Sequence, residues 1–378
     1  MNYRLLAGEK VSILGFGAMR LPLNAKGAVD EAASISLIRK SADMGVNYVD
    51  TAFVYHGGES ETIIGKALSK KYRDKVKIAT KLPLWLCNEK ADFDKYLNEQ
   101  LKKLDCGHID FYMVHALGRD PWKKARELEI LSYMQKAKKD GRIGHIGFSF
   151  HDRFESFVEI TDAFDWEFCQ IQYNYMDEDF QAGRKGMEYA AKKGISVIVM
   201  EPLRGGSLAK NLPDSVAGIF DSLKPRRSPA DMALNFVWNR PEASILLSGM
   251  NSDEQLEENV KLASSPSAGS LGEAGMAAIE KVRCEFLKFV KVPCTNCGYC
   301  LPCKSGVDIP NNFILYNGLY MYEKANSAKM SYNVFTPPNK RASACTSCGE
   351  CVAKCPQKID IPARLKDTHK ALFDGPGK

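Results

Sequence analysis

Eight short apolar segments alternate with helix-like segments along the first two thirds of this 378-residue sequence, and this alternation most constrains the fold. The predicted strands lie at 12–18, 46–52, 76–82, 109–116, 145–150, 168–174, 195–202 and 243–250. Between them lie amphipathic segments predicted as helices, among them 31–45, 59–72, 93–105, 124–141 and 228–240. Repeated strand-then-helix units predict a parallel sheet, and eight units are the content of a closed (β/α)8 TIM barrel.

An open doubly wound sheet is the alternative α/β fold. Its dinucleotide motif, G-x-G-x-x-G, would follow the first strand, but "GFGAMR" at 15–20 lacks the third Gly and leads into no immediate helix. The segment 3–13 predicts a hairpin that covers the barrel floor. A Ser/Gly/Pro-rich stretch follows residue 264 and predicts a linker. We therefore expect two domains, a barrel at 1–263 and a tail at 264–378.

The tail contains two copies of a cysteine motif. "CTNCGYCLPCKSGVDIP" at 294–310 aligns with "CTSCGECVAKCPQKIDIP" at 345–362, and Asp-Ile-Pro in each copy is a helix-start signal. The second copy has the C-x2-C-x2-C-x3-C-P spacing of [4Fe–4S] ferredoxins, whereas the first has one residue fewer before its fourth Cys and has Pro302 ahead of it. The tail is thus predicted to be a small α-helical ferredoxin-like domain with two [4Fe–4S] clusters.

In two-cluster ferredoxins, the fourth Cys of each motif binds the other cluster. This pattern assigns one cluster to Cys294, Cys297, Cys300 and Cys355, and the other to Cys345, Cys348, Cys351 and Cys303. Two zinc sites are the alternative, because C-x2-C pairs also bind zinc. Four evenly spaced cysteines in one loop, twice over, favour iron–sulfur clusters.

Composition narrows the partners and the compartment. No apolar run is long enough to span a membrane, and the first residues lack the pattern of a signal peptide, so we expect a cytoplasmic protein without disulfides. The net charge of +6 comes entirely from residues 264–378, which hold 15 Lys and Arg against 9 Asp and Glu. Two clusters would offset about four of these charges, and no dense basic run is present, so nucleic-acid binding is not expected.

Four polar residues follow or end successive predicted strands: Asp50, Tyr55, Lys81 and His115. In a barrel, the carboxyl ends of the strands meet at one rim, where active sites lie. Hydride attack on a carbonyl builds charge on its oxygen, which needs a proton donor. Tyr55 is predicted to donate this proton, helped by the ammonium group of Lys81, while Asp50 holds Lys81 and His115 bonds the carbonyl oxygen. Each residue alone has an ordinary structural explanation; the set favours catalysis.

The sequence resembles the aldo-keto reductase family over residues 1 to about 263, on "VNYVDTAFVYHGGESETIIGKAL", "VKIATKL" and "IDFYMVHA", whose Asp, Tyr, Lys and His match the family's tetrad. The resemblance implies NADPH or NADH bound across the rim without a Rossmann motif. By the same local alignment, Ser149 and Gln170 hold the nicotinamide carboxamide, Met200 replaces an aromatic that stacks on the ring, and Glu258 and Asn259 lie near the adenine.

Residues 248–255 lack the Lys and Arg with which family members grip the 2′-phosphate, so the choice between NADPH and NADH stays open. His56 and Trp85 are predicted to line the substrate pocket. The expected function is hydride transfer between NAD(P)H and a small carbonyl or alcohol substrate, with Tyr55 as general acid. One alternative is that the clusters relay single electrons from a ferredoxin or flavodoxin, through a flavin that no motif supports. Another is that the clusters are structural or redox-sensing.

Overall fold

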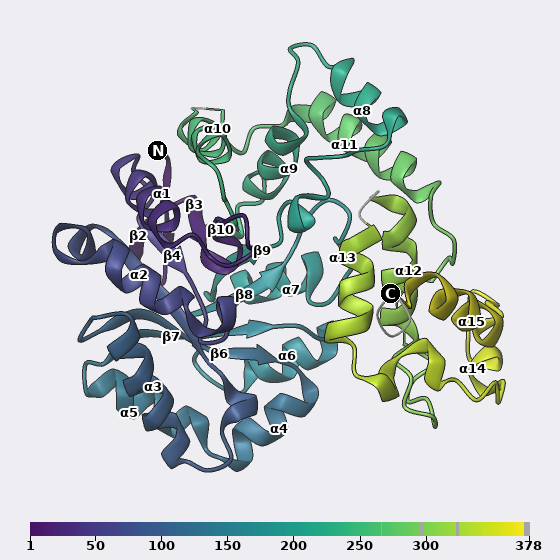
Figure 1. Cartoon of the computed structure of the whole chain (residues 1–378), viewed down its shortest axis with the longest axis horizontal. Helices are drawn as coiled ribbons and strands as arrows, with labels where there is room; N and C mark the ends of the chain where they lie inside the picture. The colour runs from purple at the N-terminus through teal and green to yellow at the C-terminus, as the bar shows by residue number, and fades with distance from the viewer. Residues whose placement is uncertain (266, 295, 297, 323–324, 374–378) are drawn as a thin grey trace. The chain divides into compact units, whose positions relative to one another are not determined.

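The first part of the chain folds into a closed barrel of eight parallel strands (Figure 1). The computed structural model describes residues 1–378 except 266, 295, 297, 323–324 and 374–378. The strands are β3 (Leu14–Gly17), β4 (Tyr48–Asp50), β5 (Lys77–Leu82), β6 (Ile109–Leu117), β7 (Ile143–Phe150), β8 (Phe168–Gln172), β9 (Ser196–Met200) and β10 (Ala243–Ser248). Because β10 pairs with both β9 and β3, the sheet has no edge, and the open-sheet alternative is wrong.

Helices surround the barrel strands in Figure 1. They are α1 (Glu31–Asp43), α2 (Ser60–Leu68), α3 (Ala91–Lys103), α4 (Arg119–Glu127), α5 (Ile130–Lys139), α6 (Phe154–Asp162), α7 (Gly183–Lys192), α9 (Pro229–Trp238) and α10 (Asp253–Ser264). The predicted helical segment 124–141 is two helices. Glu129 has a positive φ of 54°, a left-handed conformation that an α-helix cannot contain, and it separates α4 from α5.

A hairpin formed by β1 (Tyr3–Leu6) and β2 (Glu9–Ser12) precedes the barrel, as predicted. Gly8 in its turn has a φ of 84°, which suits glycine. Leu6 and Val11 are fully buried in one core with residues of the barrel interior, and the Ala7 N–H donates to Ser196 Oγ at the start of β9. The hairpin therefore covers the amino-terminal end of the barrel.

Period-two alternation along the strands explains how the site forms. Tyr48, Ala79, Met113, Phe168, Ile198 and Leu247 pack together in the barrel interior. Side chains two positions apart on a strand point to the same face. The residues two positions farther along these strands are Asp50, Lys81, His115, Gln170, Met200 and Gly249. They form the next layer, toward the carboxyl ends of the strands.

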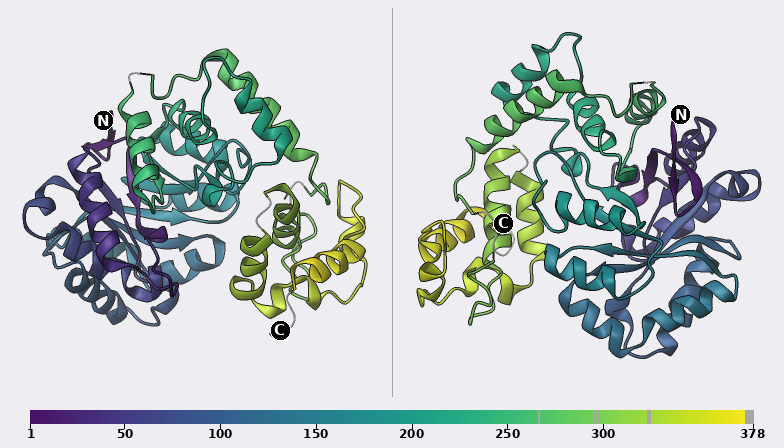
Figure 2. Two further views of the ribbon diagram at one scale, coloured as in Figure 1. Left: turned by 45° about the horizontal axis from the view of Figure 1, so that its top comes forward. Right: turned by 180° about the vertical axis from the view of Figure 1, so that it is seen from behind.

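Contacts divide the chain into two compact units, Met1–Gly205 with Ala230–Gly272, and Gly206–Pro229 with Glu273–Lys378. The second unit also takes the segment 206–229, so the domain limits 1–263 and 264–378 stay a prediction. Its helices are α8 (Asp214–Asp221), α11 (Gly272–Leu287), α12 (Ile309–Met321), α13 (Ala325–Met330), α14 (Glu350–Ala353) and α15 (Ile361–Leu372). Figure 2 shows the tail helices in green to yellow, and α12 packs against α15 around buried Phe313 and Leu365.

The two Asp-Ile-Pro motifs begin helices, as the duplicated sequence predicted. Asp308 accepts a hydrogen bond from the Asn311 N–H at the start of α12, and Asp360 accepts one from the Ala363 N–H at the start of α15. Each cap satisfies one of the backbone donors that a helix leaves unpaired at its first turn. Within the described residues, no helix has both the length and the apolar character that a membrane span needs.

A substitution at Gly65 tests how closely α2, the helix that follows the Tyr55 loop, packs against the end of α3. A Cβ at Gly65 would lie 2.6 Å from Lys103 O and 2.8 Å from Leu104 C, both backbone atoms at the end of α3. Gly65→Ala should therefore lower the free energy of unfolding by about 1–3 kcal/mol in urea denaturation. The control is Gly107→Ala, because a Cβ there meets nothing within 4 Å. Equal effects of the two substitutions would contradict this packing.

Candidate functional site

Lys81 lies at the centre of the candidate site. Its Nζ is 2.7 Å from Asp50 Oδ1 and 2.9 Å from Oδ2, donates to Thr51 O at 2.7 Å, and is 3.4 Å from the Tyr55 hydroxyl. Lys81 and Asp50 are 1% and 3% exposed, so the pair is buried. Burial opposes the charge of Lys81, but Asp50 and Tyr55 raise the pKa of Lys81 above its usual value. The side chain is therefore a permanent ammonium aimed at the phenol.

Tyr55 begins the turn η2 (Tyr55–Gly58) after β4. Burial raises the pKa of Tyr55, and Lys81 offsets only part of this rise. Lys81 thus lowers the pKa of Tyr55, as the sequence predicts, but burial outweighs it. The consequence is that the phenol is fully protonated, which a proton donor requires.

His115, on β6, is a neutral imidazole. Burial, Lys81 and His151 together hold the pKa of His115 well below its usual value. Its Nδ1 is buried and has no hydrogen-bond partner among the described residues. The His115 ring lies 6.3 Å from the Tyr55 ring in an edge-on arrangement, so both polar groups flank one space at the rim.

The two predicted substrate-pocket residues differ in their surroundings. Trp85, in the turn η4 (Leu84–Leu86) after β5, is 44% exposed, and its ring centroid lies 4.9 Å from that of His115. Trp85 thus forms an exposed apolar wall beside the tetrad. His56 follows Tyr55, but its Nε2 accepts the Leu21 N–H at 3.1 Å. Its imidazole is therefore engaged with the backbone of the loop after β3.

Ser149 and Gln170 leave one donor and one acceptor at the rim. Both are buried, at 1% and 2% exposure, and they are neighbours across β7 and β8. Ser149 Oγ accepts the Ala116 N–H at 2.8 Å, so its hydroxyl proton remains to be donated. The Gln170 amide lies beside Asp50, and its Oε1 is buried without a partner among the described residues. An acceptor and a donor this close fit a carboxamide.

The other predicted nucleotide contacts lie on two different elements. Met200 ends β9 and is partly buried in the same layer as Lys81. Glu258 and Asn259 lie on α10; Glu258 is exposed, whereas Asn259 is buried and its Nδ2 donates to Ser248 Oγ at 3.1 Å. Asn259 therefore ties α10 to the end of β10.

A buried hydrogen-bond network beside Lys81 was not predicted from the sequence. Glu61 Oε1 accepts from Thr80 Oγ1 and from Gln100 Nε2, both at 2.6 Å, and Gln100 Nε2 lies 3.1 Å from the Lys81 carbonyl. Tyr112 completes it by donating to Gln100 Oε1 at 2.7 Å. These bonds fix the strand segment that carries Lys81. Nothing in the sequence pattern marked them, since an isolated Glu or Gln in a helix is usually on the surface.

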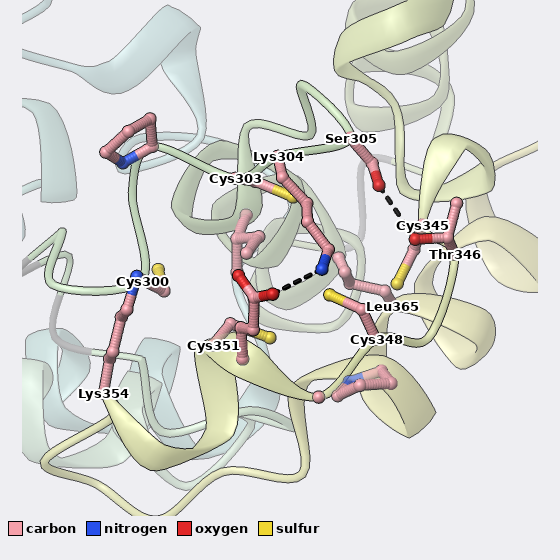
Figure 3. Close-up of a pocket in the computed structure, with 15 residues that line it drawn as sticks. Cys300, Cys303, Lys304, Ser305, Cys345, Thr346, Cys348, Cys351, Lys354 and Leu365 are labelled. Atoms are coloured by element: carbon pink, nitrogen blue, oxygen red, sulfur yellow. Dashed lines mark hydrogen bonds and ion pairs between the residues drawn. The ribbon is translucent and has the colours of Figure 1, made fainter.

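The cysteines of the tail surround two cavities. One cavity is lined by Cys300, Cys303, Cys345, Cys348 and Cys351 (Figure 3). The other is lined by Cys294, Cys300 and Cys355. Cys297 lies outside the described residues. Cys300 lines both cavities, whereas Cys303 lines the first and Cys355 the second.

Polar contacts lie beside the cysteines of the second motif. Among the described residues, no three His, Cys, Asp or Glu side chains are close enough together to hold one metal ion. The Ser347 N–H donates to Cys345 Sγ at 3.4 Å, a contact that stabilises a thiolate ligand. An ion pair between Lys304 and Glu350 lies at the same cavity (Figure 3).

Comparison with known proteins identifies the family of the barrel. The family model described as "Aldo/keto reductase family" matches residues 13–267. The chain belongs to the aldo/keto reductase family. A second model, described as "4Fe-4S dicluster domain", matches residues 293–359. This aldo/keto reductase therefore carries a dicluster domain after its barrel.

Relatives of this aldo/keto reductase match its barrel. It is 28% identical to the aldo-keto reductase YhdN of Bacillus subtilis, over 68% of this chain and 87% of the relative. It is 25% identical to the NADH-specific methylglyoxal reductase of Escherichia coli, over 62% of this chain and 83% of the relative. The holo structure of the aldo-keto reductase AKR11C1 from Bacillus halodurans has a TM-score of 0.63 at 23% identity, covering 75% and 96% of the two chains, and shows the same fold.

His115 makes the unfolding free energy of this aldo/keto reductase depend on pH. The folded pKa of His115 is depressed, so its contribution is fully present above the unfolded pKa of about 6.5 and is lost as the pH falls toward the folded pKa. Between pH 7.5 and 5.5, the wild type should lose about 1 kcal/mol more unfolding free energy than His115→Asn. Urea denaturation at both pH values, without oxygen, measures this. Parallel losses would show that the pKa of His115 is the same in the folded and unfolded protein, which would contradict its depression.

Proposed function

We propose that the barrel catalyses hydride transfer between NAD(P)H and a small carbonyl or alcohol substrate. The observation that carries this proposal is the position of Lys81 Nζ, which bridges Asp50 and the Tyr55 hydroxyl in a buried site. Bound NAD(P)H supplies the hydride. Tyr55 donates a proton to the carbonyl oxygen, and the Lys81 ammonium stabilises the tyrosinate that remains.

His115 and Trp85 complete the arrangement. The neutral His115 imidazole donates a hydrogen bond to the carbonyl oxygen as negative charge develops there. Trp85 covers the ring of His115 and keeps water from one side of the reacting group. In the oxidation direction, Tyr55 accepts the alcohol proton, with Lys81 lowering the cost of the charged phenolate.

Ser149 and Gln170 are proposed to hold the nicotinamide carboxamide. The Ser149 hydroxyl proton and the unpaired Gln170 Oε1 supply the donor and the acceptor that the carboxamide needs. Met200 offers a polarizable face to the ring, and Glu258 and Asn259 lie near the adenine. NADH is a candidate as well as NADPH, because a relative of the barrel is an NADH-specific reductase.

For the tail, we propose two [4Fe–4S] clusters with the crossed ligand sets. Cys303 joins Cys345, Cys348 and Cys351, and Cys355 joins the first motif. The cavity membership of Cys303 and Cys355 supports this. Thiolates at these positions would hold the iron atoms, and the clusters would supply one-electron chemistry or structural support. We also propose a cytoplasmic location, where cysteines stay reduced.

Electron relay is the second candidate function. Lys304, which forms an ion pair with Glu350, and Lys354 line the cavity that Cys303 shares with the second motif. Basic side chains beside a cluster favour an acidic electron carrier such as a ferredoxin or flavodoxin. A flavin would then be needed to couple single electrons to a two-electron hydride. No described residue indicates where a flavin binds.

Tyr55→Phe tests the tetrad. Removing the phenol oxygen should lower the rate of NAD(P)H-dependent carbonyl reduction at least ~100-fold, because general acid catalysis is lost while the Lys81–Asp50 pair is kept. The assay is NAD(P)H absorbance with a panel of aldehydes and ketones. Tyr189→Phe, which removes an exposed phenol that donates to Asp162, is the matched control and should not change the rate. An active Tyr55→Phe protein would refute Tyr55 as general acid.

Cys303→Ser tests the crossed ligands. The change should disrupt the cluster bound by the second motif and leave that of the first, so anaerobically prepared protein should lose about half of its iron. Cys284→Ser on α11 is the control, since Cys284 is exposed and lines neither cavity. Iron content and the electron paramagnetic resonance of the reduced protein measure the result. Loss of the first motif's cluster instead would contradict the crossed assignment, and zinc without iron would refute the clusters.

A further inference from the structure

Arg20 is a rim residue that the proposed mechanism does not use. It ends the turn η1 (Ala18–Arg20), which directly follows β3. The N–H of the next residue, Leu21, donates to His56 Nε2 at 3.1 Å, and His56 adjoins Tyr55 in sequence. The loop that carries Arg20 is therefore fixed to the loop that carries the proposed general acid.

Two glycines make room for the Arg20 side chain. A Cβ at Gly249, just after β10, would lie 3.2 Å from Arg20 Cβ and 3.4 Å from its Cδ. A Cβ at Gly205, after β9, would lie 3.0 Å from Arg20 Nη2. The side chain thus runs past the end of β10, and its guanidinium lies against the loop after β9. Its position depends on the absence of side chains at both glycines.

The guanidinium is paired with a carboxylate that has a second neighbour. Arg20 Nη1 lies 3.1 Å from Glu201 Oε1, and the two side chains are 41% and 26% exposed. A pair this exposed adds little to stability. The charge of Glu201 also reaches Tyr55, whose pKa it raises. Glu201 therefore acts electrostatically on both Arg20 and Tyr55.

The neighbouring loop offers no positive charge of its own. Residues 248–255, after β10, contain neither Lys nor Arg. In the loop after β9, Arg204 already lies 3.4 Å from Asp177 Oδ1. An anion that reaches this side of the rim would therefore meet Arg20. A guanidinium has five N–H donors, and one carboxylate oxygen does not use them all.

We propose that Arg20 binds an anionic group of the ligand that occupies this rim, and that Glu201 competes with that group for the guanidinium. The inference rests on the proposed function. The anion is a phosphate or a carboxylate, and it has two sources, the phosphates of the nicotinamide nucleotide or a carboxylate on the carbonyl substrate. Either one displaces Glu201 from Arg20 and turns an internal ion pair into a ligand contact.

Substitutions at the two residues should have opposite effects on binding. Arg20→Gln should weaken binding of the anionic ligand about tenfold, since a charge-assisted contact is lost. Glu201→Gln should tighten it about threefold, because the internal competitor is removed. The double variant should bind like Arg20→Gln. If the pair only held the loops together, both single variants would weaken binding, and the proposal would be overturned.

Dissociation constants for NADPH, NADH and inorganic pyrophosphate are measured by calorimetry on the full-length protein without oxygen. KM is measured for carbonyl compounds with and without a carboxylate. Weaker binding of NADPH alone identifies the 2′-phosphate, and weaker binding of both nucleotides identifies the diphosphate. An increased KM for carboxylated substrates alone identifies the substrate. No change in any arm refutes the role of Arg20.

The controls separate this proposal from loss of folding and from failure of the proposed function. Arg126→Gln and Glu159→Gln alter another partly exposed pair, at 3.7 Å between α4 and α6, and should change no constant. Thermal unfolding checks that every variant is folded. The dissociation constants are also measured in Tyr55→Phe, in which turnover is lowered at least ~100-fold but the other rim side chains are kept. If the wild type binds neither nucleotide, the proposed function fails, while pyrophosphate binding still decides the role of Arg20.

Discussion

The buried ion pair between Lys81 and Asp50 is the interaction on which the chemistry of the barrel depends. Two charges at 1% and 3% exposure are stable only because they lie 2.7 Å apart and the ammonium also donates to Thr51 O. Removing either partner would leave a buried charge uncompensated, at a cost of about 3–5 kcal/mol. The same pair holds a positive charge beside the hydroxyl of Tyr55, the proposed general acid.

Barrel closure decides where that pair can form. Eight parallel strands bring their carboxyl ends to one rim. Because side chains two positions apart point to the same face, the layer of inward-facing residues after the apolar interior layer is polar. Lys81 follows buried Ala79, and His115 follows buried Met113, each by two residues. The tail poses a different problem, because clusters transfer one electron at a time whereas a hydride carries two. The proposed hydride transfer therefore does not itself require the proposed clusters.

Patterns repeated along the chain were predictable, and isolated contacts were not. The eight strands and the two capped helices after Asp308 and Asp360 follow from periodic or duplicated sequence, so local physics specifies them. The interruption between α4 and α5 depends on the positive φ of Glu129, which the amino-acid composition does not predict. Arg20 and Glu201 are 181 residues apart in the sequence. Charged residues are common, so the sequence does not predict that these two form an ion pair. The sequence predicts that Lys81 lowers the pKa of Tyr55, but the larger opposing effect of burial depends on the three-dimensional packing.

Isotope transfer from the nucleotide to the product tests the central claim most directly. The anaerobic protein is given NAD(P)H deuterated at C4, on either face, with a carbonyl compound that it reduces, and the alcohol is analysed by mass spectrometry. Direct hydride transfer beside Tyr55 predicts one deuterium at the carbinol carbon, from one face of the nucleotide only. Products without deuterium, with the label lost to water, would show that the electrons pass through an exchanging carrier and would contradict the account.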